Sequence, residues 1–297
     1  MTGDDVVFLN TPGGGDPGVA LKERGASALE RALAFVSNNG DELSQTSAFV
    51  ALRAEPAVGL AGAVGPLQQE DGSFEPFAPP SSGWLGRELR SRGLPARLSG
   101  TVEGLSLLCD ARQGEAACVE SAIRFLERQQ LDDGSFAAAS FEESTRIVAT
   151  GVVGGSLARS RFARPEVLSA AATWLGERFS PEAVEAGHPA ERAAFAMFYA
   201  NVPDDLSDEI LQWCGRELER GFRTHAAEAL AVVQVLLASE VGSLPGASFA
   251  PEELLERLLE EQGADGGFDV LSPDGAPVRV GATVDAMRAI IGLCATF

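Results

Sequence analysis

The sequence has few histidines and cysteines, and few basic residues for its length. It contains 2 His and 4 Cys, and the cysteines show no spacing typical of a metal site. Lys and Arg together number 23, against 43 Asp and Glu, so the formal net charge is −20. Because binding to a phosphate backbone requires a basic surface, this charge argues against nucleic acid as a partner. Reduced thiols and no metal site are expected.

Long apolar runs are also missing. The most apolar stretch, 229–238, is far shorter than the roughly 20 residues that a membrane-spanning helix needs. The first five residues, Met1 to Asp5, are acidic and lack the basic start and apolar core of a signal peptide. These features predict a cytoplasmic protein without a membrane span.

A seven-residue phrase occurs three times, at 68–74, 130–136 and 262–268. Each copy fits Gln-x-x-Asp-Gly-(Ser/Gly)-Phe and follows an amphipathic run. Gly can take the left-handed backbone that ends a helix, and Asp can accept hydrogen bonds from nearby backbone amides. The phrase therefore predicts a helix end followed by a turn, with the Phe packed back between helices.

Two kinds of helical segment alternate along the chain. Amphipathic segments, expected on the outside of the fold, are 25–38, 57–69, 115–130, 165–179, 206–220 and 251–262. Segments that are apolar nearly all round, expected on the inside, are 45–54, 99–112, 143–158, 188–200, 224–239 and 280–295. The alternation predicts an all-helical protein in which one core extends through repeated helix pairs.

The repeated phrase resembles the Gln-Trp repeat of the terpenoid cyclases and the protein prenyltransferase β subunits, with Phe74, Phe136 and Phe268 in the place of Trp. The resemblance implies an all-α (α/α)6 toroid, with six inner helices around a cavity and six outer helices around them. Residues 1–22 are then expected to form a flexible arm and 23–297 a single toroid domain, with an insertion at about 76–99.

The resemblance also suggests a catalytic acid. Class II terpenoid cyclases carry Asp-x-Asp-Asp-Thr at the start of an inner helix, and the middle Asp protonates an alkene or epoxide. With the Thr aligned on Thr145, Glu143 falls at the position of the acid and Glu142 lies beside it. Phe141 and Ser144 depart from the motif.

Inner helices of a toroid run parallel, so polar residues at their starts should gather around one rim. His225 and Glu228 are candidates there for acid–base chemistry. The same residue types also serve as ordinary helix N-caps and first-turn acids, so both interpretations stay open. The polar residues expected on this rim are Asp41, Gln45, Thr46, Thr101, Glu103, Glu142, Glu143, Thr145, His188, Glu191, Thr224, His225, Glu228, Thr283 and Asp285.

The insertion contains Trp84 and several arginines, of which Arg87, Arg90 and Arg97 are candidates for binding a diphosphate, with Mg²⁺ as a possible companion of that substrate. A solvated loop that balances nearby acids is the alternative.

A cavity that forms carbocations should be lined with aromatic rings, whose faces stabilise positive charge. With 3 Trp and 1 Tyr in the chain, the inner helices offer mainly Phe195, Phe198 and Tyr199 for this purpose. Together with Thr145, these residues complete the expected substrate-binding set.

Two functional hypotheses follow from the resemblance. The first is an isoprenoid-binding enzyme, an isomerase or lyase, that cyclises its substrate by protonation and has no resident cofactor. The second is a non-catalytic toroid that acts as a scaffold or binding module for an apolar ligand or a protein partner. A prenyltransferase-like protein would have to be independent of zinc, because the sequence offers no Asp-x-Cys pair with a suitably placed His. The enzyme is the favoured hypothesis.

Overall fold

The computed structural model describes residues 17–53, 56–77, 84–269 and 275–297. These residues form helices joined by turns and contain no strand; a single bridge pairs Gln68 with Phe74. The prediction of an all-α protein is confirmed.

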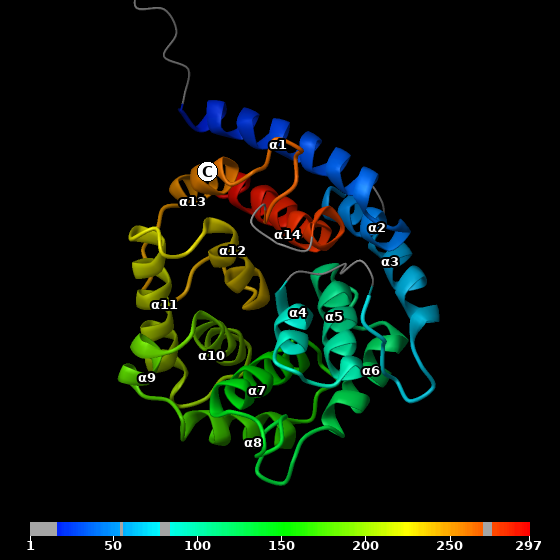
Figure 1. The fold of residues 1–297 in the computed structure, drawn as a ribbon, viewed down its shortest axis with the longest axis vertical. Coiled ribbons are helices and arrows are strands. Elements are labelled where there is room, and N and C mark those ends of the chain that lie inside the picture. The colour runs from blue at the N-terminus through cyan, green and yellow to red at the C-terminus, as the bar shows by residue number, and fades with distance from the viewer. Residues whose placement is uncertain (1–16, 54–55, 78–83, 270–274) are drawn as a thin grey trace, which may run out of the picture.

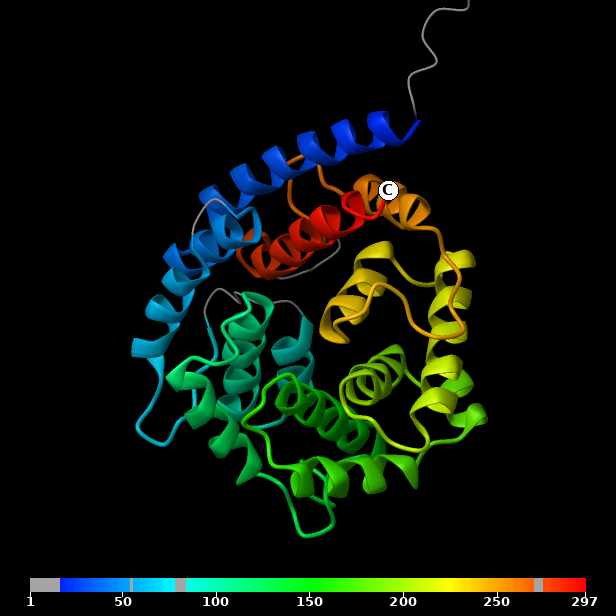
Figure 2. The ribbon, with the colours of Figure 1, turned by 180° about the vertical axis from the view of Figure 1, so that it is seen from behind.

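The helices lie in two layers around a common centre (Figure 1, and from behind in Figure 2). The outer layer consists of α1 (Pro17–Asn39), α3 (Ala57–Val64), α6 (Ala117–Glu127), α8 (Pro165–Gly176), α11 (Ser207–Arg223) and α13 (Pro251–Glu260). The inner layer consists of α2 (Glu42–Ala51), α5 (Ala96–Asp110), α7 (Glu143–Ala158), α10 (Pro189–Asn201), α12 (Ala229–Ala238) and α14 (Ala276–Cys294). Each expected segment corresponds to one of these helices.

Several boundaries differ from the expected ones. Helix α1 begins at Pro17, so residues 17–22 of the expected flexible arm are helical, and residues 1–16 lie outside the described part. Helix α14 begins at Ala276, four residues earlier than expected. Helix α12 begins only at Ala229, because His225 before it takes a left-handed backbone with φ of 57°. The expected segment 57–69 is divided into α3 and the short 3-10 helix η1 (Gly65–Leu67), and the short helix α9 (Pro181–Ala186) was not expected.

The Gln of each repeat connects two outer helices. Its side-chain amide donates to the carbonyl of the repeat's own Gly and to a carbonyl on the next outer helix. The acceptors on that next helix are Cys118 for Gln68, Val167 for Gln130 and Ala28 for Gln262. The last of these bonds joins the turn after α13, the last outer helix, to α1, the first outer helix (Figure 1).

The other residues of the repeat bind the inner helix that follows. The Phe amide donates to a Thr hydroxyl on that helix, and the Asp carboxylate pairs with an Arg one turn before the Thr. These Arg and Thr pairs are Arg97 and Thr101, Arg146 and Thr150, and Arg279 and Thr283. Each repeat therefore fixes an outer helix, its neighbour and an inner helix at one point.

The insertion contains a helix, α4 (Trp84–Ser91), that lies inside the ring between α5 and α12 (Figure 1). Arg90 forms two hydrogen bonds, of 2.8 and 3.0 Å, with the fully buried carboxylate of Glu103 on α5. Gly86 allows this approach, because a Cβ there would lie 2.2 Å from Cγ of Glu103. Residues 78–83 of the insertion lie outside the described part. The helix thus fills part of the ring's centre.

Candidate functional site

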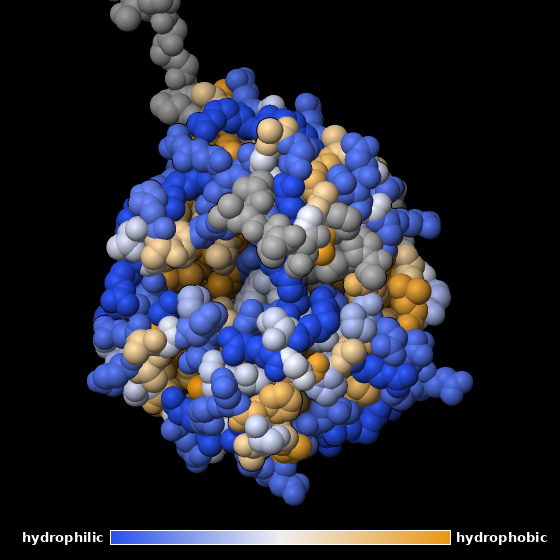
Figure 3. All heavy atoms as spheres, in the orientation of Figure 1, coloured by the Kyte–Doolittle hydropathy of each residue, from blue (hydrophilic) through white to orange (hydrophobic). Residues whose placement is uncertain are grey.

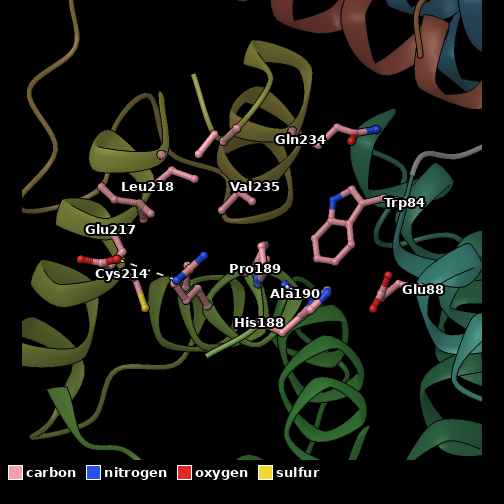
Figure 4. Close-up of a pocket in the computed structure, with 18 residues that line it drawn as sticks. Trp84, Glu88, His188, Pro189, Ala190, Cys214, Glu217, Leu218, Gln234 and Val235 are labelled. Atoms are coloured by element: carbon pink, nitrogen blue, oxygen red, sulfur yellow. Dashed lines mark hydrogen bonds and ion pairs between the residues drawn. The ribbon is translucent and has the colours of Figure 1, made fainter. Parts of the chain in front are cut away.

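An apolar chamber of about 270 Å³ lies between α10, α11, α12 and α4. Figure 3 shows the hollow on the face of the molecule, and Figure 4 shows Trp84 pointing across it from α4. Its apolar lining is dominated by small residues, with Ala190, Ala193 and Ala196 on α10 facing Ala227 and others near α12. The chamber exists because these short side chains leave the space between the helices unfilled.

Most of the polar side chains that line the chamber form ion pairs or hydrogen bonds with other residues of the protein. Glu217 is nearly buried and pairs with Arg220 and, at 3.8 Å, with Arg192. His188 at the rim caps α10, since its Nδ1 accepts a hydrogen bond of 3.2 Å from the amide of Ala190. The chamber therefore suits a ligand that is largely apolar.

Cys214 on α11 faces the same space. Its thiol is buried, and that burial raises its pKa to about 12, with nearby Arg192 opposing the shift. A thiol of this kind behaves as a small apolar side chain and not as a nucleophile.

A buried charged network borders the chamber at the centre of the ring. Trp84 and Gln234 separate the chamber from a cavity of about 20 Å³ that Asp285 also lines. Asp285 accepts a hydrogen bond of 3.0 Å from Gln234, and Arg288 lies 3.5 Å from its other oxygen. Arg288 in turn pairs with Asp110 at 2.8 Å, and Asp110 pairs with Arg159.

Burial raises the pKa of Asp285 to about 6, and the positive charge of Arg288 opposes that shift. Asp285 therefore keeps its proton to a higher pH than an Asp side chain in water. From the sequence, Asp285 was expected at the start of an inner helix, on the rim. Because α14 begins at Ala276, Asp285 is instead the tenth residue of that helix.

The carboxylates expected at the start of α7 lie away from the chamber. Glu143 is 55% exposed and pairs with Arg178 at 2.7 Å and with Arg146 at 3.7 Å, so it is held toward the end of α8. Glu142 is exposed, and Thr145 is buried; none of the three lines a cavity described above. The structure does not bring Glu143 to the ring's centre.

His225 and Glu228 lie in the turn before α12. Both side chains are exposed, and Glu228 forms no side-chain cap on the helix. Neither residue lines the chamber, although their neighbours Ala226 and Ala227 do.

The expected aromatic residues of α10 pack away from the chamber. Phe195 contacts Phe179 edge to face, and Phe198 contacts Tyr199 in the same way. The Tyr199 hydroxyl donates a hydrogen bond of 2.9 Å to the carbonyl of Ala172 on α8. These rings fill the space between the inner and outer helices, and the alanines of α10 face the chamber instead.

The arginines of the insertion do not converge on one space. Arg87 pairs with Asp269 at 2.9 Å and Arg90 with Glu103, while Arg97 pairs with Asp71 and Glu75 of the first repeat. Trp84 is the residue of the expected substrate-binding set that lines the chamber.

Within the described ranges, no group of three or more His, Cys, Asp or Glu residues could hold a metal ion. No described helix is long and apolar enough to cross a bilayer.

No protein-family model matches the chain, and no curated protein matches it by sequence. Its structure is similar to that of a protein from Actinoplanes, with a TM-score of 0.56, 14% identity, and coverage of 92% of this chain and 100% of that one. It is also similar to the type II terpene cyclase MstE from Scytonema in complex with geranylgeranyl dihydroxybenzoate, its substrate. One structure of a MstE variant gives a TM-score of 0.53, 11% identity, and coverage of 94% of this chain and 100% of that one. The structure of a second MstE variant gives a TM-score of 0.52 and 10% identity, with coverage of 94% of this chain and 99% of that one. The chain has a terpene cyclase-like fold. At these identities the similarity concerns the fold alone.

Proposed function

We propose that this protein is an (α/α)6 toroid that binds a short isoprenoid chain in the chamber between α10, α11 and α12. The observation that carries the proposal is the apolar chamber, closed on one side by Trp84, in a fold shared with a cyclase that binds a geranylgeranyl compound. Its volume of about 270 Å³ lies just below the roughly 300–1,000 Å³ of common ligand pockets, which favours the shorter prenyl chains.

We further propose that the bound chain is cyclised by protonation, with Asp285 as the acid. Its carboxyl would give a proton to one alkene carbon, so that the π electrons form the new C–H bond and the adjacent carbon becomes cationic. The next alkene closes the ring on that carbon and leaves a cyclic cation. This cation returns a proton to the Asp285 carboxylate, which gives the neutral cyclic alkene and regenerates the acid. Trp84, which borders both cavities, would stabilise the cation with its indole face.

Asp285 is favoured over Glu143 by its position. Asp285 is buried beside Trp84 and has a raised pKa, whereas Glu143 is half exposed and paired with two arginines. A general acid must lie within hydrogen-bonding reach of the group that it protonates. Asp285 does not line the chamber itself, so this role requires the bound chain to pass Trp84 and Gln234 and to reach the small cavity that the carboxyl lines. The role of Glu143 stays a prediction that the same experiment tests.

Non-catalytic binding is the second candidate, because α4 occupies part of the ring's centre and Arg288 stays close to Asp285. To separate the two, the protein is incubated with geranyl, farnesyl and geranylgeranyl diphosphates, examined by native mass spectrometry, and extracted for products. The cyclase hypothesis predicts a cyclic product that disappears in Asp285→Asn and persists in Glu143→Gln. Binding without a product supports the binding module, and loss of the product in Glu143→Gln alone supports the sequence-based acid.

A further inference from the structure

A second hollow, of about 720 Å³, lies at the other end of the inner helices. It is lined by the last turns of α2, α5, α12 and α14 and by the residue that follows α7. It shares no lining residue with the apolar chamber. We call it the arginine hollow, after its residues Arg53, Arg112, Arg159 and Arg288.

The charge of this hollow is opposite to that of the chain as a whole. Its lining carries the four arginines and the two carboxylates Asp110 and Glu240, which leaves an excess of positive charge in a chain with a formal net charge of −20. A concave site with one sign of charge concentrates ligands of the opposite sign.

Two of the arginines form a fixed floor. The Arg159 side chain is only 2% exposed and pairs with Asp110 at 2.5 Å and Glu240 at 2.8 Å. Arg288 donates to Asp110 at 2.8 Å and to the Ser47 hydroxyl at 3.0 Å. These pairs hold the guanidinium groups in place and neutralise both carboxylates of the lining.

The other two arginines are exposed and stand at unusual backbone positions. Arg53 follows the end of α2 and Arg112 the end of α5, with φ of 58° and 57°. Glycine is preferred at such left-handed positions after a helix, and a longer side chain there is strained. Neither arginine forms an ion pair with any residue that the structure describes.

We propose that the arginine hollow binds an anion of the phosphate or diphosphate class, held by Arg53 and Arg112 above the floor of Arg159 and Arg288. The guanidinium group presents parallel N–H donors that match phosphate oxygens in pairs, and two such groups can close on one anion from both sides. This proposal does not depend on isoprenoid binding, because the hollow and the apolar chamber share no lining residue. Arg288 links the hollow to Asp285, but Arg53 and Arg112 contact neither Asp285 nor the chamber.

A purely structural role for these arginines has a different consequence. Helix C-termini carry partial negative charge, and arginines near them can simply stabilise the helix ends. In that case, replacing Arg53 and Arg112 by Gly removes favourable interactions and lowers the Tm. If the side chains serve a ligand, Gly relieves the left-handed strain, and the Tm of the ligand-free protein is unchanged or raised.

The test measures binding of inorganic diphosphate by isothermal titration calorimetry at low ionic strength, with the full chain. We expect the wild-type protein to bind, and Arg53→Gln/Arg112→Gln to lose about tenfold or more in affinity. The matched control is Arg161→Gln/Arg216→Gln, which removes two exposed arginines outside the hollow and should keep the wild-type affinity. Geranyl diphosphate, titrated in parallel, shows whether a prenyl tail adds to the affinity or the phosphate group alone is recognised.

The Arg53→Gly/Arg112→Gly protein gives the second readout. We expect it to melt at or above the wild-type temperature and to lose the rise in Tm that diphosphate causes in the wild-type protein. Absence of diphosphate binding to the wild-type protein overturns the proposal. Equal affinity in the wild-type and Arg53→Gln/Arg112→Gln proteins overturns it as well.

Discussion

Gln234 and Asp285 meet at the centre of the ring, where Nε2 of Gln234 donates a hydrogen bond of 3.0 Å to Oδ2 of Asp285. The bond joins α12 to α14 and fixes a carboxyl next to Trp84. Because burial raises the pKa of Asp285 to about 6, this carboxyl changes its charge at a higher pH than an Asp side chain in water.

This shift predicts how Asp285→Asn alters the free energy of unfolding. The pKa of Asp285 is higher in the folded than in the unfolded chain. Asp285 therefore contributes most to the free energy of unfolding below pH 4, and this contribution is lost as the pH rises to about 6. The Asn variant lacks that loss, so its stability relative to wild type should increase by about 2–3 kcal/mol between pH 4 and 7. Urea unfolding at several pH values measures the difference. A difference between Asp285→Asn and wild type that stays constant across this pH range contradicts the assignment.

Gly134 in the second repeat cannot be replaced without strain. Its φ is 92°, and a Cβ there would lie 2.5 Å from the carbonyl oxygen of Ala170 on the next outer helix. Gly134→Ala should therefore lower the free energy of unfolding by about 2–3 kcal/mol. Gly62→Ala is the control, because Gly62 lies in α3 with open space around it, and alanine there should stabilise the helix. Thermal melts that rank the two variants in the opposite order would falsify the role given to the repeat.

The pair of Arg90 and Glu103 should hold α4 in the ring. Arg90→Ala leaves the fully buried Glu103 carboxylate without its main counter-charge, which should cost about 3 kcal/mol of stability. Adding Glu103→Gln removes the uncompensated charge, so the double variant should recover much of the loss. A double-mutant cycle in urea measures the coupling, and additive effects of the two substitutions contradict a direct interaction.

The sequence predicted the helices well because the repeated phrase marks where they end. Gln130, Gly134 and Phe136 make local contacts that depend little on the rest of the chain. The Arg-x-x-x-Thr pattern on the inner helices was missed, although Arg146 and Thr150 follow the phrase at a short distance and could have been found by comparing the three copies.

The site was harder to predict because it depends on which face of each helix points to the centre. Phe198 and Ala193 lie on the same helix, and only the packing of α10 against its neighbours decides that the alanine faces the chamber. Likewise, the motif placed Glu143 at the right point along α7, but its side chain turns toward Arg178. Trp84 belongs to the expected substrate-binding set and lies in the wall of the chamber, and its role in binding stays a prediction.

The most direct test of the account is the binding of farnesol to the wild-type protein and to Ala193→Leu. Ala193 is buried in the wall of the chamber, so a leucine there should fill the space and leave the fold intact, with an unchanged or higher Tm. Farnesol carries no phosphate, so its binding does not involve the arginine hollow, and Ala63→Leu on the exposed side of α3 serves as the control. The account predicts that native mass spectrometry shows farnesol bound to the wild-type and Ala63→Leu proteins, with about tenfold or weaker binding to Ala193→Leu. Equal binding to all three proteins, or to none, would contradict it.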